Sequence, residues 1–222
     1  MIPIHNTDWA LLVLLLLGGL AVYLKVSYPG RFQACWVGIR NLRPMHQFYR
    51  PEQPKSDPFL FWLETMTLLL LPMTLLIGLR LSTDSSLSSS DWSTYLMLVL
   101  AFAALQLIQY AGLLTFGWAL DRGKQTAHLL YFKRFSLRWS SFVLLPVNFV
   151  ALFALDGRSW SGSLLMGLLL AIYAYSVGRA LLRTPVKNPL HIGLLFYYLC
   201  GLEIMPLWAL IDWGSKAWIQ GI

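Results

Sequence analysis

The stretch NPLHIGLLFYYLCGLEIMPLWALIDW, residues 188–213, indicates the fold class, because it has the length of a membrane span and yet carries an acid. Between Pro189 and Trp208 its side chains are apolar or aromatic except for His191 and Glu203. A helix of about 20 such residues crosses a hydrocarbon layer about 30 Å thick, with tryptophan favoured at the interface. We therefore expect a transmembrane helix over residues 190–213.

The whole chain has the composition of a polytopic membrane protein. Of its 222 residues, 57% are hydrophobic and only 12% are charged, and the mean hydropathy is +0.60. This apolar content exceeds that of an ordinary soluble domain. A net charge of +7 would fit nucleic acid only on the basic face of a soluble binding module, whereas here the basic residues lie between apolar runs, so no nucleic-acid partner is expected.

Five further apolar runs complete the prediction of an all-α protein with six transmembrane helices in a single domain, residues 1–222. Polar turns, prolines or basic segments separate the runs. The third run is longer than a bilayer requires, so it is tilted or projects into the cytoplasm. The six predicted spans are residues 9–28, 59–81, 92–120, 139–155, 163–182 and 190–213.

Three connections on one side of the predicted membrane are basic, namely residues 29–58, 121–138 and 183–189. Fourteen of the 17 Lys and Arg residues fall in or next to them. The positive-inside rule makes these loops cytoplasmic and places both termini on the non-cytoplasmic side. The basic cytoplasmic surface is predicted to comprise Arg31, Arg40, Arg43, Arg50, Arg122, Lys124, Lys133, Arg134 and Arg138.

The first basic loop contains a helical pattern. Phe32, Trp36 and Ile39 recur at helical spacing opposite Arg31 and Arg40. This pattern favours a short amphipathic helix on the anionic cytoplasmic leaflet. An ordered loop packed on the helix ends is the alternative.

Small residues recur every four positions on the predicted span 163–182. Ser163, Gly167 and Ala171 form such a row, and rows of this kind let two helices approach closely in lipid. No long internal repeat is visible; the likeness of FLFWLE at 59–64 to FYYLCGLE at 196–203 is too short to indicate an inverted pair.

Glu203 lies near mid-depth in its span, where an ionised side chain costs at least ~2.5 kcal/mol on insertion scales. Pro206 removes a helix donor and frees a carbonyl near the same turn. The acid is either a proton carrier or ion ligand, or a hydrogen-bonded residue that holds the last helix to Gln106, Gln109 or Asn148. The sequence leaves both interpretations open.

Glu64 lies near the cytoplasmic side of the second span, where it can reach the interface. We expect it to pair with a basic residue such as Arg179 or Arg183, or with His191. A water-filled cavity shared with Glu203 would favour transport, but the predicted depths of the two acids differ.

Motifs for catalysis and metal binding are missing. His46, His128 and His191 are expected on one side of the membrane, but no two have the spacing of a ligand pair, so neither metal nor other cofactor is expected. Cys35 and Cys200 fall in a loop and a helix, so no disulfide is expected. The sequence contains no H-E-x-x-H, no G-x-S-x-G with a partner histidine and no Gly-rich phosphate loop. We predict no enzymatic activity.

The segment LHIGLLFYYLCGLEIMPLWAL, residues 190–210, resembles the C-terminal signature of a family of uncharacterised polytopic inner-membrane proteins of Bacteroidota, a domain of unknown function. FQACWVGIRNLRPMHQFYR, residues 32–50, is similar to the family's basic loop after the first helix. The resemblance implies a bacterial inner membrane and one shared task for Glu203 and Pro206, and it implies no activity. The residues that match the C-terminal signature are His191, Tyr198, Leu199, Cys200, Leu202, Glu203, Ile204, Pro206 and Leu207.

Three functional hypotheses remain. The first is a non-enzymatic scaffold or accessory subunit of an envelope or protein-export assembly, with the lipid bilayer and other membrane proteins as partners and no oligomeric state implied. The second is a small proton-coupled transporter that uses Glu203. The third, an enzyme acting on lipid through His128 and His191, has no motif behind it.

Overall fold

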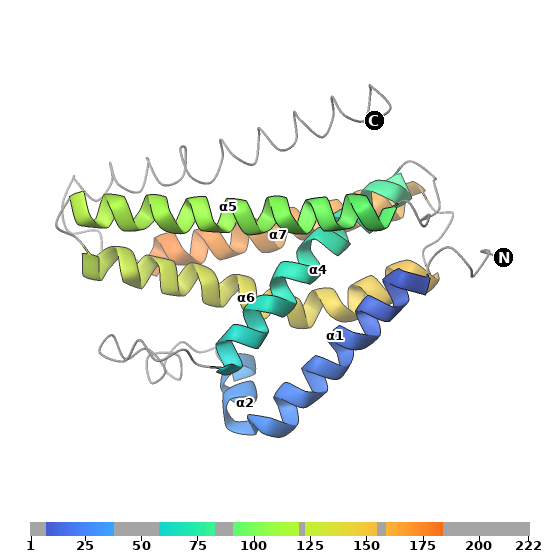
Figure 1. The fold of residues 1–222 in the computed structure, drawn as a ribbon, viewed down its shortest axis with the longest axis horizontal. Coiled ribbons are helices and arrows are strands. Elements are labelled where there is room, and N and C mark those ends of the chain that lie inside the picture. Colours follow the sequence, from blue (N-terminus) through green and yellow to red (C-terminus); the bar gives the residue numbers. More distant parts are fainter. Residues whose placement is uncertain (1–7, 38–57, 83–90, 120–122, 155–158, 184–222) are drawn as a thin grey trace. The chain divides into compact units, whose positions relative to one another are not determined.

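The structure is a computed structural model that describes residues 8–37, 58–82, 91–119, 123–154 and 159–183. In these ranges it contains helices and no strands, which confirms the all-α prediction (Figure 1). The predicted last span, with His191, Glu203 and Pro206, lies outside the described residues, as do Arg40, Arg43 and Arg50. The helices are α1 (Asp8–Ser27), α2 (Pro29–Val37), α4 (Pro58–Ser82), α5 (Asp91–Ala119), α6 (Gly123–Ala154) and α7 (Ser159–Arg183).

Three of the helices are long and apolar enough to cross a membrane. They are α1, α4 and α5, and their bounds lie within a residue or so of the predicted spans. Shorter apolar stretches occupy Leu137–Phe153 of α6 and Ser161–Ser176 of α7. The chain is therefore a membrane protein by the length and composition of its helices.

The start of α6 differs from the prediction. Residues 123–138 were expected in a basic loop, but α6 is continuous over 32 residues from Gly123. The stretch between Gly123 and Pro146 contains no further glycine or proline, and Lys and Arg are good helix formers. Basic residues thus indicate where a chain leaves the membrane and not where its helix ends.

The described chain forms two compact units. The first takes in residues up to Leu100 together with 134–175, and the second takes in 101–133 and the chain from Ser176 onward. Gln106 and Gln109 belong to the second unit, where Gln109 is buried. The remaining description concerns the first unit.

The core of the first unit is built around α4. In the most apolar 18-residue stretch of each helix, 56% of α4 is buried, against 22% of α1 and 11% of α5. The buried side chains repeat at intervals of three and four residues, which is one face of a helix. They are Leu63, Met66, Leu70, Met73 and Ile77.

Helix α1 runs opposite to α4 (Figure 1). At one end Tyr28, just after α1, makes an edge-to-face contact with Phe59 at the start of α4, with centroids 5.8 Å apart. At the other end Trp9 of α1 meets Trp92 and Tyr95 of α5, at 5.4 and 5.5 Å. These aromatic contacts fix the two ends of the unit.

The short helix α2 confirms the helical alternative for the first basic loop, over Pro29–Val37. Its Phe32 ring lies 4.9 Å from that of Phe142 on α6, and the Arg31 guanidinium lies 6.0 Å from the centre of the Tyr28 ring. Trp36 is 57% exposed. Part of the apolar face of α2 therefore packs on α6.

Close helix approach occurs at a different glycine from the one expected. Ser163, Gly167 and Ala171 of α7 are exposed, and nothing lies within 4 Å of a Cβ built on Gly167. A Cβ built on Gly78 of α4, in contrast, would lie 3.2 Å from the sulfur of Met166 on α7. Gly78 is the residue that lets α7 pack on α4.

Candidate functional site

Charged and polar side chains lie between α4 and α6 in the first unit, and all of them except the half-exposed Glu64 are buried. We call this set the α4–α6 seam. It comprises Glu64, Thr67 and Thr74 of α4 and Arg138, Ser141 and Asn148 of α6.

The first contact of the seam is an ion pair. Nη2 of Arg138 donates a hydrogen bond to Oε2 of Glu64 over 2.6 Å. The Arg138 side chain is 9% exposed and that of Glu64 is 44% exposed, so the carboxylate compensates a largely buried charge. Within the described residues, Nε of Arg138 is buried and has no hydrogen-bond acceptor.

This pair bears on two expectations. Glu64 does pair with a basic residue, and the partner within the described residues is Arg138, which was not among the three candidates; the side chains of Arg179, Arg183 and His191 lie outside the description. Arg138 was expected on the cytoplasmic basic surface, and it is instead buried at 7% exposure. Arg138 lies on the inner face of α6, beside the buried residues Leu137 and Ser141. A count of basic residues in a loop does not reveal which of them face inward.

The second contact lies ten residues further along both helices. Nδ2 of Asn148 donates to Oγ1 of Thr74 over 2.9 Å, and the Thr74 hydroxyl donates to the carbonyl of Leu70 over 2.8 Å. Both side chains are fully buried. Oδ1 of Asn148 finds no donor among the described residues. Asn148 was predicted as a candidate partner of Glu203, which lies outside the described residues; within them Asn148 bonds to α4.

The two contacts have the same sequence separation of 74 residues. Since a step of ten residues along α4 is matched by ten residues along α6, the helices run in the same general direction, as Figure 1 shows. An antiparallel pair would reverse the order of the contacts. One helix, α5, returns the chain between them.

Thr67 and Ser141 occupy matching positions within the seam. Both are buried, and each hydroxyl donates to a carbonyl of its own helix: Thr67 to Leu63 over 2.8 Å and Ser141 to Arg138 over 2.7 Å. Back-bonding of this kind satisfies a hydroxyl without a partner helix. These two side chains therefore add buried polar groups that need no partner on the other helix.

A further ion pair joins the ends of α4 and α5. Arg80 pairs with Asp91 through Nη2 and Oδ1, and Asp91 is almost fully buried. Nearby, the Tyr95 hydroxyl donates to the carbonyl of Leu69 over 3.2 Å. Pro72 has no N–H, so within α4 it removes the helix hydrogen bond to the carbonyl of Leu68, the residue before Leu69. Tyr95 thus binds the carbonyl next to the one that the proline leaves without its helix donor.

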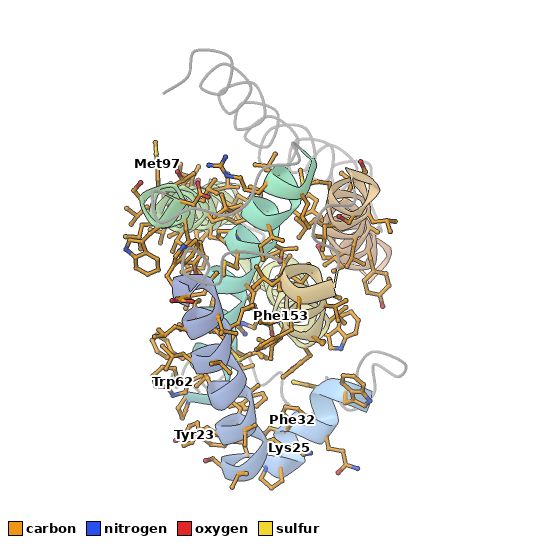
Figure 2. The ribbon with its side chains drawn as sticks, turned by 90° about the vertical axis from the view of Figure 1, so that its right-hand side faces the viewer. Tyr23, Lys25, Phe32, Trp62, Met97 and Phe153 are labelled. Atoms are coloured by element: carbon orange, nitrogen blue, oxygen red, sulfur yellow. The ribbon has the colours of Figure 1, made fainter. Side chains whose placement is uncertain are left out.

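The two ion pairs and the bonds of Asn148 and Tyr95 join one helix to another. In the described part of the chain no three His, Cys, Asp or Glu side chains come together as metal ligands do. Trp62, Tyr23 and Met97 project outward from the ribbon in Figure 2, in keeping with their exposure. The site resembles the polar contacts that hold membrane helices together.

The comparisons with known proteins bear on identity and not on activity. The sequence model of one family, described as a domain of unknown function (DUF4271), matches residues 10–213. Neither the curated proteins nor the solved structures provide a match. Because the family match covers nearly the whole chain, this protein belongs to the DUF4271 family.

Proposed function

We propose that this protein is a multi-pass membrane scaffold or accessory subunit of an envelope or protein-export assembly. The observation that carries the proposal is that polar and charged side chains of the first unit pair between helices of this chain: Glu64 with Arg138, Thr74 with Asn148, and Arg80 with Asp91. Side chains paired in this way hold the helices of a membrane bundle together.

Exposed apolar side chains support the membrane setting. Two helices carry most of them, and exposed apolar faces of this extent fit lipid or another membrane protein. Trp118 of α5 is 86% exposed. Other exposed residues of this kind are Leu12, Leu15, Leu16, Val22 and Val26 on α1, and Met97, Leu100, Leu107, Ile108 and Leu114 on α5.

The proposal includes six spans with both termini on the non-cytoplasmic side, in the inner membrane of a member of Bacteroidota. The direction of α6 supports this topology, since it runs with α4 and pairs with it over ten residues. The end of the first unit that holds Glu64 and Arg138 is also the end of α1 that carries Lys25. By the positive-inside rule that end is cytoplasmic.

The partners are proposed to bind the basic cytoplasmic loops. The test is affinity purification of the tagged protein in mild detergent, followed by quantitative mass spectrometry. We expect the same envelope proteins to co-purify with the wild type in fixed ratio. A variant with Arg40, Arg43 and Arg50 changed to Glu should lose them several-fold, because the sequence places these charges in the first basic loop.

The matched control is Lys25→Glu, which changes one exposed charge on α1 outside that loop. It should retain the partners. Purification of the wild type alone and monodisperse in several detergents would remove the scaffold proposal.

A further inference from the structure

The sequence separation shared by both seam contacts gives an offset at which α4 and α6 can be compared. At an offset of 74, FWLETMTLLLLPMT (61–74) aligns with FSLRWSSFVLLPVN (135–148). The prolines within both helices, Pro72 and Pro146, fall at the same position, and Thr67 aligns with Ser141. The other identical pairs are Phe61 with Phe135, Leu63 with Leu137, Leu70 with Leu144, and Leu71 with Leu145.

Each seam contact joins a residue to its own equivalent. Glu64 aligns with Arg138 and bonds to it, and Thr74 aligns with Asn148 and bonds to it. Where two copies of a helix meet across a two-fold axis parallel to them, the residues that face the axis contact their own equivalents. Two such contacts ten residues apart are the pattern that this symmetry produces.

The helices that follow give a second, independent likeness. Trp92 and Ser93 open α5, and Trp160 and Ser161 open α7. The tryptophan follows the helix proline by 20 residues in the first case and by 14 in the second, and the longer connection contains the serine-rich sequence 82–91. Each stretch thus contains a helix with an internal proline, followed by a second helix with Trp-Ser at its second and third positions.

The direction of the two stretches agrees with duplication. A unit with two membrane helices returns to the side from which it started, so a second copy enters the membrane in the same direction as the first. The parallel course of α4 and α6 is what such a duplication requires.

We propose that residues 58–119 and 123–183 are two copies of one helical hairpin, and that the α4–α6 seam is the surface on which the copies pair. The difference between Glu64 and Arg138 gives this surface its selectivity. A copy paired with itself would oppose two carboxylates or two guanidinium groups, whereas the pair in this chain opposes unlike charges. The inference holds whether or not the protein scaffolds a larger assembly.

Exchange of equivalent residues in the full-length protein tests the symmetry. Thr74 and Asn148 are both fully buried, so the double variant Thr74→Asn/Asn148→Thr should recreate the contact from the opposite helix. We expect its thermal midpoint in detergent to lie within about 2 °C of the wild type. Thr74→Asn, which puts a second amide where the seam holds a hydroxyl, should lie lower, whereas the hydroxyl of Asn148→Thr can bond within its own helix as that of Ser141 does, so this variant should lie closer to the wild type. A double variant as unstable as the worse single variant would overturn the proposal.

The charged pair tests selectivity in the same assay. Arg138→Glu opposes two carboxylates and should lower the thermal midpoint, and the exchange Glu64→Arg/Arg138→Glu should recover at least half of the loss. Failure to recover would show that the pair does not select the partner hairpin. If the charged variants do not accumulate in the membrane, the Thr74 and Asn148 exchange alone decides the proposal.

Discussion

Arg138 of α6 is held by Glu64 of α4 through a 2.6 Å hydrogen bond, and the arginine is the more deeply buried partner. This asymmetry predicts the effect of removing the acid. Glu64→Ala should lower the free energy of unfolding by about 1–3 kcal/mol, because it leaves a buried guanidinium without this counter-charge, whereas the lost Glu64 side chain was itself 44% exposed. Thermal unfolding in detergent, followed by tryptophan fluorescence, measures the change.

Lys25→Ala is the matched control for that experiment. Lys25 is exposed near the end of α1, so its removal should leave the midpoint unchanged. Equal losses for the two variants would mean that charge at this end of the unit, and not the ion pair, sets stability.

We expect opposite changes in stability when the donor or the acceptor of the bond between Asn148 and Thr74 is removed. Asn148→Leu removes the Oδ1 that has no donor, and Thr74 keeps its own bond to Leu70, so stability should be unchanged or slightly higher. Thr74→Val instead leaves a buried amide with no acceptor for Nδ2 and should cost about 1–3 kcal/mol. Chemical or thermal unfolding of the two variants gives the signs directly. A larger loss for Asn148→Leu than for Thr74→Val would show that Oδ1 is satisfied in the membrane.

Gly78 and Gly167 offer a paired test of helix packing. Gly78→Leu should destabilise the protein by about 1–3 kcal/mol, since its side chain must displace Met166 on α7. Gly167→Leu faces open space and should have no comparable effect. If Gly167→Leu instead disrupts an oligomer seen by native mass spectrometry, the exposed face of α7 is a contact between subunits.

The long apolar helices were predictable, and their contacts were not. The bounds of α1, α4 and α5 follow from apolar runs of spanning length that end at polar turns or prolines. The start of α6 was missed because Lys and Arg were taken as loop residues although they favour helices. Arg138 was not foreseen as a partner of Glu64 because it lies 74 residues away, in a segment assigned to the surface. Only the offset between the two prolines, Pro72 and Pro146, could have indicated it.

The proposed orientation can be read with single cysteines at the two ends of α1. In a protein with Cys35 and Cys200 changed to Ala, a membrane-impermeant maleimide added to intact cells should label Asp8→Cys and not Lys25→Cys. Both positions are exposed, so access from one side of the membrane is what differs. Lys25→Cys should become reactive once the inner membrane is permeabilised. The reverse order of labelling would place the basic loops outside and overturn the topology.

Substitution of Glu203, which lies outside the described residues, distinguishes the scaffold hypothesis from the carrier hypothesis. Glu203→Gln keeps the size and most of the hydrogen-bonding capacity of a protonated carboxyl, but it cannot release a proton. If the acid serves packing, wild-type and variant proteins in liposomes should show the same slow proton leak under an imposed gradient, with a small difference in thermal midpoint. A gradient-driven proton flux in the wild type that Glu203→Gln abolishes would replace the scaffold with a carrier, because packing alone does not depend on a titratable proton at mid-depth.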